Sequence, residues 1–296
     1  MSTYHTSVLL REVVEALRIE KDHWYIDATL GGGGHSLAII QQGGRVLGVD
    51  QDADSISYVE DKFKVQNSKF KIGVDVKLVR GNFRDIDKLV AEAEIEAVSG
   101  ILYDLGVSSH QIDTPERGFS FQREGPLDMR MSSELGVTAA DLVNGLTKNE
   151  LYELFITLGE EYNARAICDR IISARGVKPI VTTSELAELI RGPKRTFAKT
   201  DPATKVFQAL RIAVNDELHG LTESLPKALA LLSTGGRLAV ISFHSLEDRI
   251  VKNVFKEFEE KNLGIIVTKK PIIPSDLEQE ENRRSRSAKL RVFEKK

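Results

Sequence analysis

The sequence lacks several features that mark specialised classes of protein. Cys168 is the one cysteine among 296 residues, which excludes an intramolecular disulfide framework and is typical of a reducing compartment. No apolar run approaches the roughly 18 residues of a membrane-spanning helix, and charged residues interrupt the opening segment Met1–Leu17. We therefore expect no signal peptide, no membrane partner and a cytoplasmic location.

An excess of charge of one sign is lacking as well. The 41 Lys and Arg residues and the 44 Asp and Glu residues leave a formal net charge of −3, which argues mildly against a nucleic-acid partner. The balance is nevertheless uneven along the chain. Arg191–Lys205 contains five basic residues and one acid, and Asn282–Lys296 contains seven basic residues and one acid. Such clusters are typical of phosphate binding, although a charged run is more often a solvated surface.

The first 110 residues alternate between short β-branched runs and helical patterns. This alternation is typical of βαβ units that build a parallel sheet. We expect strands at Trp24–Ala28, Arg45–Val49, Val76–Val79 and Val98–Tyr103, with helices near Ser36–Gln42 and Ala53–Phe63.

Helix signals dominate from about residue 113 to residue 214. Thr147 with Glu150, and Thr182 with Glu185, have the spacing of reciprocal helix caps. Asp201-Pro202 is a further helix start, because proline at the first helical position loses no hydrogen bond. One helix face is expected to carry a run of apolar residues spaced three or four apart, namely Phe207, Leu210, Val214, Leu218 and Leu221.

Strand patterns return near the C-terminus. We expect a strand at Gly236–Phe243, a helix from Ser245 to about Lys261, and strands at Gly264–Thr268 and Leu290–Glu294. The last two strands are close enough to form an antiparallel hairpin, and Pro271–Asn282 is expected to be a solvated loop. The prediction is an α/β, Rossmann-like fold with a mostly parallel sheet, in which residues 1–112 and 215–296 form one discontinuous domain and residues 113–214 a helical insertion.

Four consecutive glycines, Gly31 to Gly34, lie between the first strand and the helix that follows it. Glycine permits positive φ and leaves no Cβ in the way of a ligand, and a helix N-terminus attracts anions. Asp50 closes the second strand 19 residues after Gly31, where a carboxylate can accept both hydroxyls of a ribose. The pattern predicts a nucleoside cofactor; the alternative is that these glycines only form a tight turn.

The dinucleotide pattern Gly-x-Gly-x-x-Gly is incomplete, because Ser36 stands where its last glycine would be. This weakens the case for a nicotinamide cofactor and favours S-adenosylmethionine (SAM). The Asp27 carboxylate could approach the amino group of SAM. The fourth strand ends in Asp104 and a polar turn that runs to Gln111. Because ligands bind at the carboxyl ends of strands in open α/β sheets, Asp104 is expected to face the same crevice.

Several longer stretches resemble the bacterial ribosomal RNA small subunit methyltransferase H family, whose members methylate cytosine N4 of 16S rRNA with SAM. The stretches span nearly the whole chain in order: His5-Thr-Ser-Val-Leu-Leu10, Gly33-Gly-His-Ser36, Asp104-Leu-Gly-Val-Ser-Ser109, Arg117-Gly-Phe-Ser-Phe121, Gly125-Pro-Leu-Asp-Met-Arg-Met131, Phe207-Gln-Ala-Leu-Arg-Ile212 and Ile241-Ser-Phe-His-Ser-Leu-Glu-Asp-Arg249. Two departures are visible: His110 stands where proline is more usual, and Arg283 where Asn-Pro-Arg is common.

The resemblance implies a SAM-dependent methyltransferase sheet, no metal ion, and a cytidine in the ribosomal decoding region as substrate, in 16S rRNA or in the small ribosomal subunit. It implies that the cofactor contacts are Gly33, Gly34, His35, Asp50, Phe83, Asp104 and Gln111. With it, the basic clusters become candidate RNA contacts at Arg195, Lys199, Arg283, Arg284 and Arg286, and the insertion a candidate substrate-recognition domain.

Asp104 is the candidate catalytic residue, because an acceptor for the cytosine amino group would help to localise its nitrogen lone pair. Cofactor binding alone is the alternative for Asp104. Phe119, Phe121 and Phe243 are candidates to stack the base, and His244 also lies at a strand end; a core role is the alternative for each aromatic. Two other functions stay open at this point: a nicotinamide-dependent oxidoreductase, and a non-catalytic SAM-binding ribosome-assembly protein.

Overall fold

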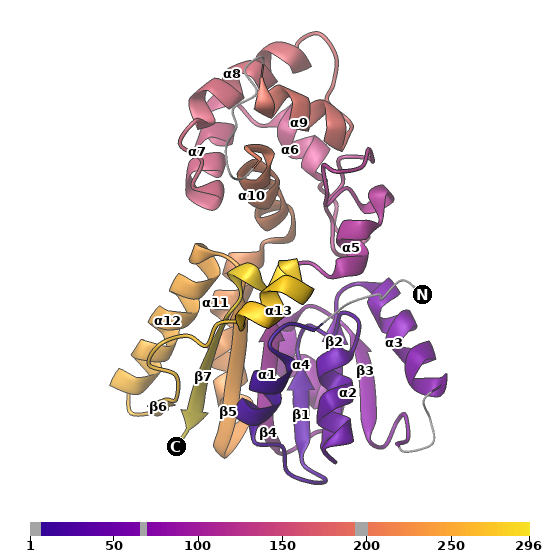
Figure 1. The fold of residues 1–296 in the computed structure, drawn as a ribbon, viewed down its shortest axis with the longest axis vertical. Helices are drawn as coiled ribbons and strands as arrows, with labels where there is room; N and C mark the ends of the chain where they lie inside the picture. The colour runs from indigo at the N-terminus through magenta and orange to yellow at the C-terminus, as the bar shows by residue number, and fades with distance from the viewer. Residues whose placement is uncertain (1–6, 66–69, 193–200) are drawn as a thin grey trace. The chain divides into compact units, whose positions relative to one another are not determined.

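The computed structural model describes residues 7–65, 70–192 and 201–296, which divide into two compact units (Figure 1). The first unit comprises Met1–Ser108 and Leu218–Lys296, and the second comprises Ser109–Glu217. Each unit has a hydrophobic core of its own, so each is described by itself.

A seven-stranded sheet forms the first unit, in the order β3-β2-β1-β4-β5-β7-β6. Its strands are β1 (Trp24–Asp27), β2 (Arg45–Asp50), β3 (Val76–Arg80), β4 (Val98–Asp104), β5 (Leu232–Ser242), β6 (Gly264–Ile266) and β7 (Lys289–Lys295). The first five strands pair in parallel, whereas β7 runs antiparallel to both β5 and β6. This confirms the predicted mostly parallel sheet with an antiparallel C-terminal pair.

The two faces of the sheet bury alternate residues of each strand, as the pleat requires. Tyr25 and Leu102 face one core, and their chain neighbours Ile26 and Tyr103 face the other. The first face packs against α1 (Leu10–Leu17), α2 (Gly34–Gln41) and α3 (Ala53–Val65), and the second against α4 (Ile86–Glu92), α11 (Glu217–Leu231) and α12 (Ser245–Glu260) (Figure 1). Helices therefore cover both faces, and the ends of the strands are left for function.

Over its described residues, the second unit is built from helices, apart from an irregular stretch at residues 118–138. Its helices are α5 (Ser109–Asp113), α6 (Ala139–Gly145), α7 (Lys148–Gly159), α8 (Ala164–Arg175), α9 (Thr183–Arg191) and α10 (Ala203–Asn215), with a 3-10 turn at Pro115–Arg117. The predicted caps are confirmed, because Thr147 with Glu150 and Thr182 with Glu185 each form a complete capping box. Asp201 also acts as predicted, since its carboxylate accepts the N–H of Ala203 at 2.9 Å.

The prediction of one continuous helix face from Phe207 to Leu221 is wrong. Helix α10 ends at Asn215, Asp216 adopts a left-handed φ of 49°, and α11 begins at Glu217. The Asn215 amide donates to the Met129 carbonyl at 2.8 Å, and its oxygen accepts the Met131 N–H at 2.7 Å. These tertiary bonds hold the end of α10 where the apolar spacing alone predicts that the helix continues.

The segment Pro271–Asn282 is also more ordered than the solvated loop that the sequence predicted. It contains a further helix of the first unit, α13 (Asp276–Glu281), followed by a 3-10 turn, η3 (Arg283–Ser287). The Ser275 hydroxyl caps α13 by accepting the Glu278 N–H at 3.2 Å. The signal for this helix was present as Ser275-x-x-Glu278, the spacing of a capping box.

Candidate active site

Three acids mark the carboxyl ends of neighbouring parallel strands in the first unit. Asp27 ends β1, Asp50 ends β2 and Asp104 ends β4. The crossover from β1 to β2 runs to one side of β1, and β4 pairs on the other side, so the strand order reverses at β1. In open α/β sheets, the crevice for a ligand forms at such a switch point.

The glycine loop lies directly above this point. Gly31 and Gly33 have φ values of +49° and +68°, and a Cβ on Gly33 would lie 2.9 Å from a methyl group of Val59. A Cβ on Gly34 would collide with the Ser7 hydroxyl. Gly31 is different, because the nearest atoms to its Cβ position are the Thr29 carbonyl oxygen at 3.8 Å and Ser108 Cβ at 4.0 Å. A Cβ at Gly31 would therefore make only ordinary van der Waals contacts, so the positive φ, rather than a close neighbour, is what favours glycine at this position.

Asp50 holds the glycine loop in place. Its carboxylate accepts the Gly31 N–H at 2.8 Å and the Asp52 N–H at 2.9 Å. Burial raises the pKa of this carboxyl to about 6, although both N–H groups act in the opposite direction. Each carboxylate oxygen has a second lone pair, so Asp50 can still accept hydroxyl donors such as those of a ribose.

Asp27 is almost completely buried, with 1% of its surface exposed. The Ser36 hydroxyl donates to one of its oxygens at 2.7 Å, and burial raises the pKa of the carboxyl. Ser36 is the residue that replaces the last glycine of the dinucleotide pattern. Its hydroxyl fastens the first turn of α2 to the end of β1, a contact that glycine could not make.

His35 and Asp104 are brought together beside the loop. The imidazole Nε2 of His35 donates to the carbonyl oxygen of Val8 at 3.0 Å, and Nδ1 lies 3.6 Å from the Asp104 carboxylate. The Asp104 backbone N–H donates to the Thr29 hydroxyl at 2.6 Å. Sequence reasoning did not single out Val8 or Thr29, since neither contact has a local pattern.

The remaining predicted cofactor contacts lie in different parts of the chain. Phe83 opens the 3-10 turn after β3, is half-buried, and meets the Tyr103 ring edge to face with centroids 5.5 Å apart. Gln111 belongs to α5 in the second unit, where it is buried. Lys62, which the sequence did not point to, donates to the Gly32 carbonyl at 2.8 Å from α3.

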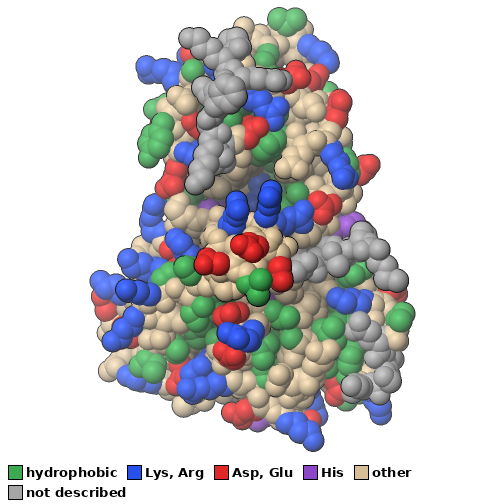
Figure 2. Space-filling model, in the orientation of Figure 1, with side chains coloured by type: hydrophobic (Ala, Val, Ile, Leu, Met, Phe, Trp, Pro, Cys, Tyr) green, Lys and Arg blue, Asp and Glu red, His purple; other side chains and the backbone are tan. Residues whose placement is uncertain are grey.

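Not all basic residues of the two clusters are available at the described surface. Arg195 and Lys199 lie outside the described residues. Arg291 is 9% exposed and bonds the Asp248 carboxylate at 2.7 Å, and Lys295 donates to main-chain carbonyls at the end of α11. Arg283, Arg284 and Arg286 are exposed on η3. Figure 2 shows basic and acidic side chains gathered over α13 and the turn that follows it.

The candidate base-stacking groups have structural contacts. Phe121 packs edge to face on Phe207, with centroids 5.0 Å apart, and Phe119 packs against the same core of the second unit. Phe243 packs against a core of the first unit. His244 is the N-cap of α12, where its Nδ1 accepts the Glu247 N–H and its Nε2 lies 3.1 Å from the Glu247 carboxylate.

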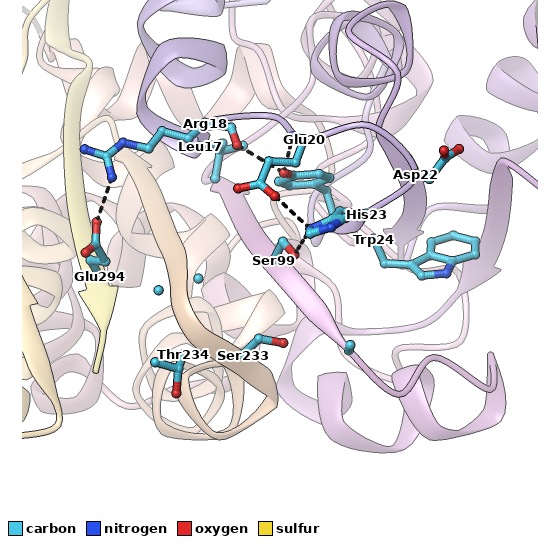
Figure 3. A pocket seen from close by; sticks show the side chains of 14 residues that line it. Leu17, Arg18, Glu20, Asp22, His23, Trp24, Ser99, Ser233, Thr234 and Glu294 are labelled. Carbon is cyan, nitrogen blue, oxygen red and sulfur yellow. Dashed lines mark hydrogen bonds and ion pairs between the residues drawn. The ribbon is translucent and has the colours of Figure 1, made fainter.

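A cavity of about 550 Å³ lies at the opposite edge of the sheet, at the amino ends of β1, β4 and β5 (Figure 3). Several of its polar groups pair with one another: Arg18 lies 3.5 Å from Glu294, and His23 lies 3.5 Å from the Glu20 carboxylate and 2.9 Å from the Ser99 hydroxyl. Among the described residues, no cluster of His, Cys, Asp or Glu is arranged to hold a metal ion, and no helix is long and apolar enough to cross a membrane. The strand-end crevice is therefore the candidate active site.

The doubly wound sheet, the glycine loop and the acid that ends β2 define the class of Rossmann-like, nucleoside-binding methyltransferases. The MraW methylase family matches residues 2–296, and the chain belongs to this family. It is a SAM-dependent rRNA methyltransferase that acts on cytosine N4.

The chain is also similar to several solved structures. An rRNA methylase from Streptococcus thermophilus is 11% identical with a TM-score of 0.44, and the alignment covers 97% of this chain and 93% of that one. A protein from Streptococcus mutans, solved in complex with SAH, is 14% identical with a TM-score of 0.46, covering 98% and 99% of the two chains. NSun6 from Pyrococcus horikoshii is 14% identical with a TM-score of 0.46, covering 98% of this chain and 52% of its own.

The glycine loop yields a prediction about Gly33. Gly73 also has a positive φ, of +88°, but no atom lies within 4 Å of its Cβ position. Gly73→Ala should therefore cost only the left-handed backbone, about 1–2 kcal/mol. Gly33→Ala should cost about 1–3 kcal/mol more, because its methyl group overlaps Val59. Denaturant unfolding measures the loss of unfolding free energy in both variants. In a Val59→Ala background, where the methyl groups of Val59 are absent, Gly33→Ala should cost less than it does in the wild-type protein. Equal costs at Gly33 and Gly73 would contradict the contact with Val59.

Proposed function

We propose that this protein transfers the methyl group of SAM to N4 of a cytidine in the decoding region of 16S rRNA, within the small ribosomal subunit and in the cytoplasm. The observation that carries the proposal is the bond between the Asp50 carboxylate and the Gly31 N–H, which joins the strand-end acid to the glycine loop at the switch point. In this proposal the helical unit Ser109–Glu217 recognises the RNA substrate.

Bound SAM supplies a methyl group activated by its sulfonium charge. Gly33, Gly34 and His35 would hold the methionine part, because the N-terminus of a helix such as α2 favours a carboxylate. Asp50 would accept the ribose hydroxyls, and Phe83 and Gln111 would add further contacts. The contribution of the protein is chiefly orientation, which can supply roughly 7–11 kcal/mol of the reduction in barrier.

Asp104 is the proposed catalytic residue. Its side chain is 9% exposed and ends β4 beside His35, with its backbone fixed by Thr29. A carboxylate at this position can accept a hydrogen bond from the cytosine amino group, which localises the nitrogen lone pair toward the methyl group. The amino proton is lost after the transfer, and in this proposal Asp104 accepts it.

The proposed function is tested by incubating the protein with labelled SAM and three unmethylated acceptors: assembled small subunits, free 16S rRNA and DNA. We expect label in RNA, at N4 of a cytidine in the decoding region. Asp104→Asn should lower turnover at least 100-fold, as expected for loss of a positioned acid or base, while leaving SAM affinity within a few fold.

Two outcomes would count against these assignments. Binding of SAM without incorporation of label into any acceptor would indicate a non-catalytic role. Full turnover of Asp104→Asn, with unchanged SAM affinity, would remove Asp104 from the mechanism.

The raised pKa of Asp50 predicts a pH dependence of cofactor binding. Below pH about 6 the free enzyme carries a neutral Asp50, whereas two ribose hydroxyls bind best to the ionised carboxylate. The dissociation constant for SAM should therefore rise about tenfold per pH unit below pH 6 and stay constant above it. Asp50→Asn should bind weakly at every pH and remove this inflection. Calorimetry between pH 5 and pH 8 provides the measurement, and a flat wild-type profile would contradict the ribose role.

The exposed arginines of η3 are proposed to contact RNA phosphates. Replacing Arg283, Arg284 and Arg286 together by Gln should weaken RNA binding and reduce the slope of log K against log salt concentration by about 2. A matched control replaces three exposed lysines of α12 and the residue that follows it, Lys252, Lys256 and Lys261. Filter binding over a range of salt concentrations measures both variants, and equal slopes in the two would count against the assignment.

A further inference from the structure

The segment Ser7–Leu9 lies across the first turn of α2, and α13 holds it there. Gly34 needs to lack a side chain because Ser7 occupies the position of its Cβ. The next residue, Val8, accepts the hydrogen bond from His35 Nε2 at 3.0 Å. The N–H of Leu9 then donates to the Glu278 carboxylate of α13 at 2.7 Å, across 269 residues of sequence. Three consecutive residues thus connect α13 to the histidine of the cofactor loop.

Glu278 is diverted from the bond that its position in α13 would otherwise favour. Helix α13 starts with Ser275-x-x-Glu278, and the Ser275 hydroxyl accepts the Glu278 N–H. In the chain as described, four other helices have both a capping side chain at the N-cap and an acid at this position, namely Asp141, Glu150, Glu185 and Glu247, and each of these acids turns back to the N–H of its own N-cap residue. The Glu278 carboxylate instead binds the main chain of Leu9.

Leu9 is held in a conformation that leucine rarely adopts. It is completely buried, has φ 54° and ψ 35°, and is the N-cap of α1 without a capping side chain. A left-handed conformation costs a residue with a Cβ roughly 1–2 kcal/mol, and persists where the surroundings fix it. The Glu278 bond fixes the N–H side of Leu9, and the Val13 N–H binds its carbonyl at 2.9 Å. The peptide unit that joins Val8 to Leu9 therefore has a defined orientation.

That peptide unit carries both bonds. Its N–H, on Leu9, points to Glu278, and its carbonyl, on Val8, accepts from His35. Because a peptide unit is planar, rotation that breaks the bond to Glu278 also turns the carbonyl away from His35. The orientation of His35, with Nδ1 3.6 Å from Asp104, therefore depends on a carboxylate on the opposite side of the peptide.

We propose that Glu278 is a positioning residue of the active site, which orients the His35 imidazole through the Val8–Leu9 peptide. The inference rests on the proposed function, in which His35 contacts the methionine part of SAM. Glu278 does not touch the cofactor or the reacting atoms. A purely structural role as a distant cap for α1 would affect stability but not the state of the His35 ring.

The test compares three substitutions of Glu278 with one control. Glu278→Ala removes the acceptor, and Glu278→Asp keeps the charge but is one methylene too short to reach Leu9. Glu278→Gln retains an oxygen that can accept the N–H. Glu280→Ala, at an exposed position of the same helix, is the control.

Two readouts are used, both below the melting temperature of each variant. Nitrogen NMR of the His35 ring in the cofactor-free protein should show a shift of Nε2 in the Ala and Asp variants and wild-type values in Gln and in the control. Calorimetry with SAH should show about tenfold weaker binding for Ala and Asp, and less than threefold for Gln and the control. If the Ala variant does not fold, the Asp variant alone is compared with the wild-type protein.

Each outcome has a defined meaning. A lower melting temperature with unchanged His35 shifts and unchanged SAH affinity in both Ala and Asp overturns the inference and leaves the proposed function standing. Wild-type protein that binds no SAH overturns the proposed function and, with it, this inference.

Discussion

The hydrogen bond from the Gly31 N–H to the Asp50 carboxylate is the constraint on which the site depends. A loop of four glycines has little conformational preference of its own, so its shape has to come from bonds to fixed partners. Asp50 supplies one, Lys62 holds the Gly32 carbonyl, and the bond between Ser36 and Asp27 fixes the helix start beyond the loop. Asp27 and Asp50 stand on strands of the sheet and Lys62 stands on α3, so the loop is tied both to the sheet and to a helix that covers it.

The same bonds bear on the pKa values of the acids at the carboxyl ends of the strands. Burying carboxylates beside one another is costly, and burial raises the pKa of both Asp27 and Asp50. The N–H and hydroxyl donors of the loop offset part of that cost, because they favour the ionised form. Asp50 therefore combines two tasks in the proposed function: it holds the backbone of the glycine loop and it accepts the ribose hydroxyls of the cofactor.

The sequence was sufficient for those features that depend on local pattern and on strand order. Asp27, Asp50 and Asp104 could be assigned to one edge because each ends a parallel strand, and Thr147 and Thr182 could be assigned as caps from spacing alone. It was insufficient where a distant contact decides the local structure. The helix break at Asp216 depends on the bonds of Asn215 to the main chain near Met129, and apolar periodicity does not register a one-residue interruption. Basic composition likewise does not separate Arg291, which pairs with the partly buried Asp248, from the exposed arginines of η3.

The segment from Ser275 to Ser287 shows how a late part of the chain can complete a site formed by the early part. Its acid, Glu278, binds the segment Ser7–Leu9 that supports His35, and its arginines follow immediately in η3. Ser285 is completely buried and its hydroxyl donates to the Asn282 carbonyl at 2.8 Å, so the arginine turn is anchored to the end of α13. The groups proposed to meet RNA and the group proposed to orient the cofactor histidine therefore belong to one continuous, internally bonded unit.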